Sequence, residues 1–289
     1  MWLPWTYSLP LAGLLFAIGA VAGLINGGGT VGAVAREASR VALLYTLWQV
    51  AGRLSVSGIE RANDRGLWVW HLERTLRLPS ERAFQELIVP HGWLAQAANV
   101  YYAVAHVPGM GLFLVWLFFF HRAEYPGWRN VLVGITFVSL LIQLMPVAPP
   151  RLIPSIGMLD TGVAYGQSVY AIGGSTVAGQ LQAMPSLHVG WAALIAIATW
   201  RLSTRWARWL GAGHLVATVA VVTITANHYW LDGLACIALL VPLVALLTGR
   251  RHPEAGSAPE AAIDALAVHR ATPGAEPAFA VKTGGRPGH

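Results

Sequence analysis

Charged residues are scarce in this chain: Asp, Glu, Lys and Arg make up only 11% of its 289 residues, while 55% are hydrophobic. Soluble domains carry about 25% charged residues, so this composition excludes an ordinary soluble protein and indicates an integral membrane protein. Cysteine is nearly absent too, because Cys236 is the single one. One cysteine excludes an intrachain disulfide and says nothing about the redox compartment. Since Cys236 lies within an apolar run, we expect a buried structural thiol.

The net charge of +6 would by itself suggest a nucleic-acid-binding protein. The basic residues, however, stand in short loops between apolar runs, a pattern that membrane topology explains better. No internal sequence repeat is apparent. We therefore expect the lipid bilayer, and no nucleic acid, as a partner of this chain.

Several apolar runs reach the roughly 20 residues that a helix needs to cross a bilayer. We expect an all-α, polytopic helical bundle with spans at 9–25, 31–52, 99–120, 130–147, 208–227 and 229–249, and a shorter one at 185–200. The first of these segments is either a span or an apolar helix that does not cross the bilayer.

Residues 53–98 differ from the rest, because mixed charges alternate there with bulky apolar side chains. This pattern predicts one or two amphipathic helices lying on the membrane interface, and a soluble linker is the alternative interpretation. The end of the chain is rich in Ala, Pro, Gly and Glu without periodicity, which predicts disorder. The chain thus divides into N-terminal spans (1–52), interfacial helices (53–98), a catalytic membrane core (99–250) and a disordered tail (251–289).

The loops at 121–129 and 201–208 carry several arginines, and a further arginine pair closes the last span. Because loops rich in Arg and Lys stay in the cytoplasm, all three should be cytoplasmic. The candidate catalytic residues described next stand at the opposite ends of their spans. We therefore expect a multi-pass protein of the cytoplasmic membrane with its active site on the extracytoplasmic side.

Carboxylates are rare in the second half of the chain: between Glu124 and Glu254 there are only Asp160 and Asp232. At helical pitch, Asp232 can reach back to a ring nitrogen of His228, four residues earlier. Such a contact fixes the tautomer of the histidine and makes the other nitrogen more basic, as a nucleophile requires. A purely structural ion pair is the alternative. Two isolated acids cannot build a two-metal site, so we expect no metal and no other cofactor.

Two more stretches suggest phosphate binding. Arg151 follows a run of prolines at the end of a span, and its planar guanidinium suits phosphate oxygens. Pro185 and Ser186 are typical of a helix start, where free backbone N–H groups are available to an anion, and His188 falls in the first turn. Taken singly, each residue also has a plainer interpretation, as an interfacial side chain that reaches toward water.

Together these stretches resemble a known family. Pro185-Ser186-x-His188 followed by His228-x-x-x-Asp232, with an arginine upstream beside proline, resembles the type-2 phosphatidic acid phosphatase superfamily over roughly residues 60–250. The resemblance implies a six-helix core, to which this chain adds an N-terminal span and the interfacial segment. It also implies metal-free transfer of a phosphoryl or phosphodiester group through a phosphohistidine.

The resemblance further implies a role for each matching residue. His228 matches the nucleophile, Asp232 its orienting partner, and His188 the acid that protonates the departing oxygen. Arg151 and Ser186 match groups that bind the phosphate. In-line displacement at phosphorus is consistent with these roles, because it needs a nucleophile, an acid on the opposite side and positive charge around the equatorial oxygens.

More narrowly, the chain resembles the bacterial branch related to inositol phosphorylceramide synthases. Three stretches carry this narrower resemblance: Tyr101-Tyr102-x-x-x-His106-x-Pro108, Ala148-Pro149-Pro150-Arg151 and Asp160-Thr161. Tyr102, His106 and Asn227 are candidates for the substrate pocket, with Tyr101 beside them. Simple packing is the alternative for the aromatic and histidine residues.

The chain departs from the superfamily at two positions where a cation is expected. A lysine is replaced by Leu144, and a Ser-Arg pair by Val221 and Val222. With fewer cations, a site loses more binding affinity for a doubly charged terminal phosphate than for a singly charged phosphodiester. This favours a singly charged phosphodiester donor, as in the synthase branch.

We therefore expect an enzyme that acts on a lipid phosphate or phosphodiester, either as a lipid phosphatase or as a phosphotransferase. Water as the second acceptor gives hydrolysis and an alcohol gives transfer, and the motifs do not separate the two. The alternative is a catalytically silent transporter or lipid-binding scaffold of the same fold. Transporters often contain broken helices and inverted repeats near the bilayer midplane, whereas the polar groups here stand at span ends.

Overall fold

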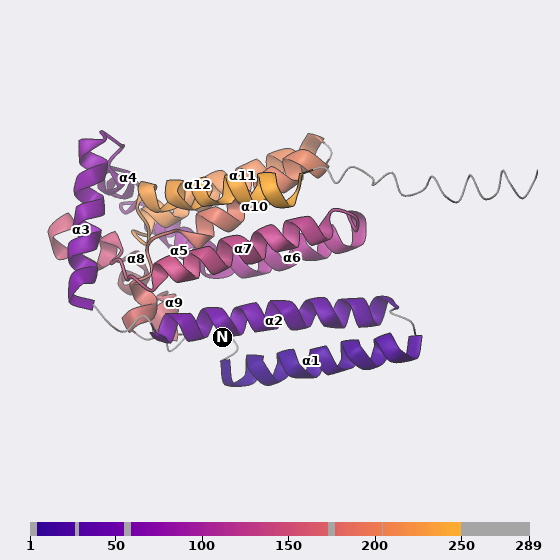
Figure 1. Ribbon diagram of the computed structural model, residues 1–289. Helices are drawn as coiled ribbons and strands as arrows, with labels where there is room; N and C mark the ends of the chain where they lie inside the picture. Colours follow the sequence, from indigo (N-terminus) through magenta and orange to yellow (C-terminus); the bar gives the residue numbers. More distant parts are fainter. Residues whose placement is uncertain (1–4, 27–28, 55–58, 173–176, 204, 250–289) are drawn as a thin grey trace, which may run out of the picture. The chain divides into compact units, whose positions relative to one another are not determined.

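A computed structural model describes residues 5–26, 29–54, 59–172, 177–203 and 205–249 of the chain. Within these ranges every element of regular secondary structure is a helix (Figure 1). The expected all-α helical bundle is therefore confirmed. The tail over 251–289, for which we predict disorder, lies outside the described residues, and the division of the chain into four functional parts stays a prediction.

Among the described residues, four helices are long and apolar enough to cross a membrane, and a bent pair makes a fifth if its halves form one span. The chain is therefore an integral membrane protein. The four are α1 (Trp5–Asn26), α7 (Tyr125–Gln143), α11 (Arg205–Ile224) and α12 (Trp230–Leu247), and the pair is α5 (Gly92–Val104) with α6 (His106–Phe120).

Two predicted spans form helices that fall short of these criteria. Helix α2 (Thr30–Leu54) is long enough, but it carries Arg36, Glu37 and Arg40 near its start. Helix α10 (Leu187–Leu202) is apolar but has only 16 residues. Both nevertheless run alongside the longer helices (Figure 1).

The predicted span at 99–120 begins earlier than expected and is broken. Helices α5 and α6 meet at Ala105 with a bend of 49°. Pro108 stands in the first turn of α6, where its missing N–H costs nothing. The break matters for the site, because it places a histidine at the start of α6.

Helices α1 and α2 form an antiparallel pair that is tied together by polar groups. Ser39 Oγ donates to the carbonyl of Ala12 at 2.8 Å, and Arg36 Nη1 donates to the carbonyl of Gly19 at 2.9 Å. Helix α2 is in turn fixed to α7, where Arg129 Nη1 pairs with Glu37 Oε1 at 2.7 Å. In apolar surroundings such paired groups lower the cost of burying charge.

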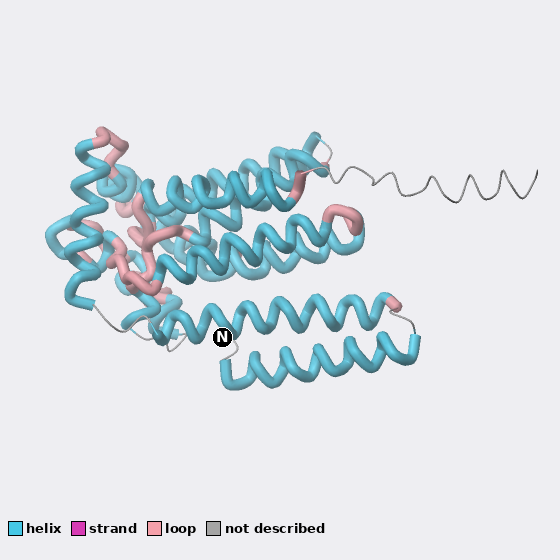
Figure 2. The backbone as a smooth tube through the Cα atoms, in the orientation of Figure 1, coloured by secondary structure: helices cyan, strands magenta, loops and turns pink. Residues whose placement is uncertain are grey.

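The segment predicted to be interfacial forms two short helices at one end of the bundle. These are α3 (Ile59–Thr75) and α4 (Glu81–Ile88), and α3 runs across that end rather than along the bundle (Figure 1). Together with the turn at 76–80 we call them the interfacial hairpin. Most of the loop structure lies at the same end (Figure 2). It contains the short helices η1 (Pro150–Leu152), η2 (Pro154–Ile156), α8 (Thr161–Ala164), α9 (Val169–Ile172) and η3 (Val177–Gln180).

Two buried clusters hold the structure together. The larger one lies between α6, α7, α10 and α12, and Cys236 within it is fully buried, as expected for a structural thiol. The smaller one joins α3 to the 147–158 loop and Tyr229. Gly66 allows this contact, because a Cβ there would lie 2.6 Å from the carbonyl oxygen of Ala148 and 2.9 Å from the hydroxyl of Tyr229.

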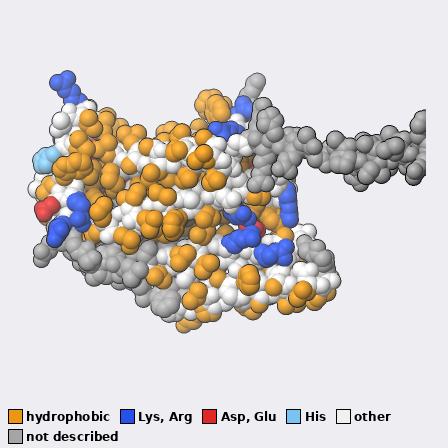
Figure 3. All heavy atoms as spheres, viewed as in Figure 1, with side chains coloured by type: hydrophobic (Ala, Val, Ile, Leu, Met, Phe, Trp, Pro, Cys, Tyr) orange, Lys and Arg blue, Asp and Glu red, His pale blue; other side chains and the backbone are white. Residues whose placement is uncertain are grey.

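The outer surface agrees with a lipid environment. Large hydrophobic side chains cover the sides of the helices, and arginines gather toward the ends (Figure 3). Phe119 and Phe120 on α6 are 62% and 75% exposed. A soluble protein would not leave so many large apolar groups in contact with water.

Candidate active site

The predicted catalytic pair does not lie on one helix. His228 belongs to the loop between α11 and α12, and α12 begins only at Trp230, so the expected helical pitch between His228 and Asp232 is wrong. The two side chains meet because Asp232 stands in the first turn and reaches back over the helix start. Its Oδ2 accepts the backbone N–H of Tyr229 at 2.8 Å, as part of a capping box.

His228 has one of its two ring nitrogens occupied by the protein. Its Nδ1 lies 2.7 Å from the carbonyl oxygen of Ala183 and 3.4 Å from Asp232 Oδ2. Because a carbonyl oxygen only accepts, Nδ1 carries the hydrogen, and Nε2 is left with its lone pair. The sequence could not name Ala183, since any residue type supplies a backbone carbonyl. A nearby carboxylate also stabilises the positive charge that the imidazole ring acquires when Nε2 forms a covalent bond as a nucleophile.

Asp232 joins the start of α12, which follows His228, to the start of α10, which carries His188. Its side chain is fully buried, and its backbone carbonyl accepts the N–H of Ser186 at 3.0 Å. Asp232 thus has structural contacts in addition to the one with His228. The roles predicted for it and for His228 are consistent with this geometry and stay predictions.

Helix α10 begins as the sequence predicts, with Ser186 as its N-cap. The Ser186 hydroxyl oxygen accepts the N–H of Val189 at 3.4 Å, and Ser186 itself is fully buried. Its own N–H is engaged by the Asp232 carbonyl. Phosphate binding by Ser186 stays a prediction, and in this conformation Ser186 builds the helix start on which His188 stands.

His188 lies in a row of neighbouring rings, stacked on Tyr102 and tilted against His106 and His228. Its ring centroid is 4.4 Å from that of Tyr102, 4.1 Å from that of His106 and 5.5 Å from that of His228. The ring of His106 stacks in turn on Trp191 at 4.4 Å. The bend at Ala105 makes this possible, since Tyr102 precedes it and His106 follows it. Tyr102, His106, His188 and His228, predicted from three separate stretches, are thus brought together.

Tyr101 points elsewhere. Its hydroxyl lies 2.7 Å from Nδ1 of His214 and 3.1 Å from Oγ1 of Thr218, both on α11. These contacts match the packing alternative for this residue.

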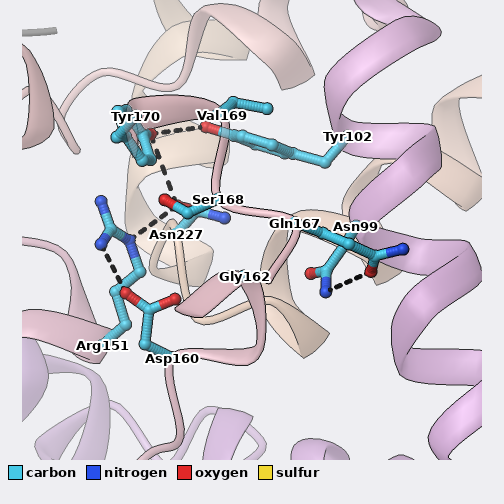
Figure 4. A pocket seen from close by; sticks show the side chains of 10 residues that line it. All are labelled: Asn99, Tyr102, Arg151, Asp160, Gly162, Gln167, Ser168, Val169, Tyr170 and Asn227. Atoms are coloured by element: carbon cyan, nitrogen blue, oxygen red, sulfur yellow. Dashed lines mark hydrogen bonds and ion pairs between the residues drawn. The ribbon is translucent and has the colours of Figure 1, made fainter. Parts of the chain in front are cut away.

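Arg151 is buried beside the loop between α11 and α12, and its guanidinium is already engaged. Nε donates to Asn227 Oδ1 at 2.9 Å and Nη1 donates to Asp160 Oδ2 at 2.7 Å (Figure 4). The ring of Tyr170 lies under it, with Cζ 4.5 Å from the ring centroid. Asp160 balances the charge of Arg151, a function that the sequence did not assign. The sequence feature that could have identified Asp160 is its rarity, since it is one of two carboxylates between Glu124 and Glu254.

Arg151 lines a small polar cavity of about 20 Å³, which is room for roughly one water molecule. Helix α5, the 160–170 segment and the loop between α11 and α12 contribute its walls. The lining residues are Asn99, Tyr102, Arg151, Asp160, Gly162, Gln167, Ser168, Val169, Tyr170 and Asn227 (Figure 4).

A second cavity of about 310 Å³ adjoins the first, because Tyr102, Asn227, Val169 and Tyr170 line both. His188 and His228 lie at its polar end, together with several amide side chains. The rest is mostly apolar and is formed by α2, α6, α7 and α10. No lysine, arginine, aspartate or glutamate stands among the described residues that line this larger cavity.

No lysine or arginine among the described residues that line the larger cavity replaces the cations missing at Leu144 and Val222. Leu144 is 44% exposed and Val222 is buried. Arg122, one possible substitute, lies over the ring of Phe118 at the other end of α6. The side chain of Arg53, another candidate, lies outside the described residues. Within the described part of the chain, no group of three or more His, Cys, Asp or Glu side chains could hold a metal ion.

Comparisons with known proteins give one match. Residues 67–246, more than half of the chain, match a family model described as "PAP2 superfamily". The match contains every predicted site residue and leaves out α1 and α2. No curated protein and no solved structure matches the chain.

Proposed function

The chain belongs to the PAP2 superfamily, and from this premise we propose that it transfers the phosphate-containing headgroup of a membrane lipid through a covalent bond to His228. Membership supports phosphatase-type chemistry on a phosphate-containing substrate. The lipid substrate, the nucleophile and the use of an alcohol acceptor are our proposal. They follow from the residues around the two cavities.

The observation that carries the proposal is the environment of His228. Its Nδ1 is held by the Ala183 carbonyl with Asp232 beside it, and its ring lines the larger cavity. The nitrogen that remains, Nε2, is the one that can attack a phosphorus atom. When the N–P bond forms, the ring becomes positively charged, and the Asp232 carboxylate at 3.4 Å stabilises that charge.

In the first step, the bond from Nε2 to phosphorus forms while the ester bond to the lipid alcohol breaks. The departing oxygen takes a proton from His188, whose ring centroid lies 5.5 Å from that of His228. In the second step, water or an alcohol gives its proton back to His188, and its oxygen displaces Nε2 from phosphorus. Both histidines then return to their initial states, and no metal enters either step.

The larger cavity supports a lipid as substrate. It leads from the histidines between helices whose side chains are apolar, among them Leu44 of α2, Leu114 of α6 and Leu132 of α7. Burying an apolar chain there gains about 25 cal/mol per Å². A soluble phosphate ester has no group that would use this space.

The charges around the site favour a phosphodiester over a terminal monoester. Arg151, whose charge Asp160 balances, is the cation that lines the smaller cavity. Neutral amides and histidines line the polar end of the larger one. A doubly charged phosphate needs more positive charge than this to leave water. We therefore propose transfer of a diester headgroup to an alcohol, as in the inositol phosphorylceramide synthase-like branch.

The distribution of arginine supports an extracytoplasmic site. Arg129 and Arg201 lie at the end of the bundle far from His228, where Arg129 pairs with Glu37 of α2 and Arg201 donates to Thr248. By the positive-inside rule that end faces the cytoplasm. We propose that the protein is a multi-pass protein of the cytoplasmic membrane and that the histidines face outward.

The test uses detergent-purified full-length protein with a panel of lipid phosphates and lipid phosphodiesters in EDTA, with and without inositol or glycerol. Products are identified by mass spectrometry. His228→Ala is the inactive variant, and His71→Ala, at an exposed histidine of α3, is the matched control. Headgroup transfer that requires His228 supports the proposal. Release of inorganic phosphate alone would make the protein a lipid phosphatase, and no product from any lipid would favour the silent scaffold.

A further inference from the structure

Three polar side chains of the interfacial hairpin are buried against the loop that carries His228. Glu73 and Glu81 are 0% exposed and Gln85 is 4% exposed. Long polar and charged side chains are rarely so deeply buried without partners. Their partners lie on both sides of the catalytic loop, residues 225–229.

Gln85 of α4 holds the chain where it enters the catalytic loop. Its Nε2 donates to the carbonyl of Ile224, the last residue of α11, at 2.7 Å. The same amide group also binds both backbone groups of Leu159. Nε2 donates to the Leu159 carbonyl at 2.9 Å, and Oε1 accepts the Leu159 N–H at 2.7 Å. Leu159 directly precedes Asp160, the partner of Arg151.

The two glutamates hold the chain where it leaves the loop. Glu73 Oε1 accepts the N–H of Leu231 at 2.8 Å, and Glu81 Oε1 accepts the N–H of Trp230 at 3.4 Å. With Asp232 on the N–H of Tyr229, three successive amides at the start of α12 each meet a carboxyl group. Carboxyl groups suit this position, because a helix start has unpaired N–H groups and a partial positive charge.

Trp230 strengthens the contact between the hairpin and α12. Its indole N–H donates to the carbonyl of Pro79 at 2.8 Å. The ring of Phe84 packs against it edge to face, with centroids 5.7 Å apart. The hairpin therefore contacts both the backbone N–H groups at the start of α12 and the side chain of Trp230.

From these contacts we infer that the interfacial hairpin positions His228, with Gln85 fixing the end of α11 and Glu73 and Glu81 fixing the start of α12. Both ends of the five-residue catalytic loop are bound to one short element outside the membrane-spanning bundle. If the hairpin shifts, the loop shifts with it relative to His188 on α10. Glu73, Glu81 and Gln85 are positioning residues, and neither cavity is lined by any of them.

The charge state of the pair follows from its surroundings. Burial and a hydrogen bond with Glu81 raise the pKa of Glu73 to about 9. Glu73 is therefore neutral near pH 7. Nη2 of Arg74 lies 2.9 Å from Glu81 Oε2 and 3.9 Å from Glu73 Oε2. Asp232, on the same helix start, also raises the pKa of Glu73. A glutamine can replace a neutral glutamate here, since it offers the same acceptor and a donor.

The inference rests on the proposed function, so its test has one readout that needs no substrate. Glu73→Gln, Glu73→Leu and Gln85→Leu are compared with Glu86→Gln, a control at an exposed acid of α4. Hydrogen–deuterium exchange of the peptide covering 222–233 is measured on purified full-length protein. We expect faster exchange in Glu73→Leu and Gln85→Leu, and wild-type exchange in Glu73→Gln and Glu86→Gln.

Activity is then measured on whichever lipid the wild type turns over in a His228-dependent manner. Because about 1 Å of misplacement costs about a hundredfold in rate, we expect the two leucine variants to lose at least about tenfold in kcat with little change in KM. Glu73→Gln should retain most of the wild-type kcat. Unchanged exchange in both leucine variants would overturn the inference even if no substrate is found. Equal losses in Glu73→Gln and Glu73→Leu, or a loss confined to KM, would also overturn it.

Discussion

Substituting Gly190 by alanine should push apart α10, which carries His188, and α12, whose start adjoins the loop that carries His228. Gly190 on α10 faces Cys236 on α12, and a Cβ at Gly190 would overlap the sulfur atom of Cys236. Cys236 is fully buried and cannot turn away into open space. Overpacking of this kind costs about 1–3 kcal/mol. We expect Gly190→Ala to lower the free energy of unfolding by that amount and to lower kcat, because the distance between His188 and His228 depends on this contact.

The structure also predicts a suppressor. Once Cys236 is replaced by alanine, the nearest atoms to the new Cβ are Cys236 Cβ at 3.5 Å and Ile135 Cγ1 at 3.9 Å, which are ordinary contacts. Cys236→Ala alone should cost about 1 kcal/mol for the lost buried sulfur, comparable to one methylene group. The double variant should therefore be more stable than the sum of the two single effects predicts, by about 1–2 kcal/mol.

The assay is chemical denaturation of the four proteins in one detergent, with turnover measured on the same samples. Gly213→Ala on α11 is the control, because no atom lies within 4 Å of a Cβ at that position. It should be neutral or stabilising by up to about 1 kcal/mol, since alanine favours a helix more than glycine does. Strictly additive effects of Gly190→Ala and Cys236→Ala would refute the contact between α10 and α12 as described.

Three further predictions concern pH, lipid and metal. Since the pKa of Glu73 is raised from 4.5 to about 9, the unfolded chain releases this proton at lower pH than the folded protein does. Stability should therefore fall as pH rises from about 5 to about 9, and Glu73→Gln should flatten that decline in thermal unfolding. Leu44→Trp, in the α2 wall of the larger cavity, should reduce kcat/KM for long-chain lipids more than for short-chain ones. Leu43→Trp, at an exposed position of α2, should not, and equal losses on both chain lengths would contradict a tail-binding cavity. EDTA should leave the rate unchanged, and a rate restored by added Mg²⁺ would argue against the histidine mechanism.

Hydropathy predicted most of the helices, because long apolar runs in a membrane protein leave few alternatives to a helix. It could not predict the break at Ala105. Nothing in the apolar run marks it except Pro108, which α6 tolerates in its first turn. The sequence did predict a shorter helix at 185–200, and α10 (Leu187–Leu202) agrees with it.

The site was predictable where side chains of unusual type stand at helix ends. His188, His228 and Asp232 are conspicuous in apolar surroundings, and the structure brings them together. Apart from Asp232, the groups that hold these side chains in place were not predictable. The carbonyl of Ala183 carries no residue signature, and Glu73 resembles any other acid of an amphipathic segment until the fold buries it.

The central claim is that His228 carries the headgroup phosphate between donor and acceptor. The most direct test incubates purified protein with a phosphodiester that has a p-nitrophenyl leaving group, quenches in alkali and maps the modified peptide by mass spectrometry. A p-nitrophenolate leaves without an acid, so His188→Ala should still be modified at His228 but should resolve the adduct slowly. The account predicts an acid-labile adduct on His228 that His228→Ala lacks. Turnover with no adduct on His228 in either the wild type or His188→Ala would contradict it.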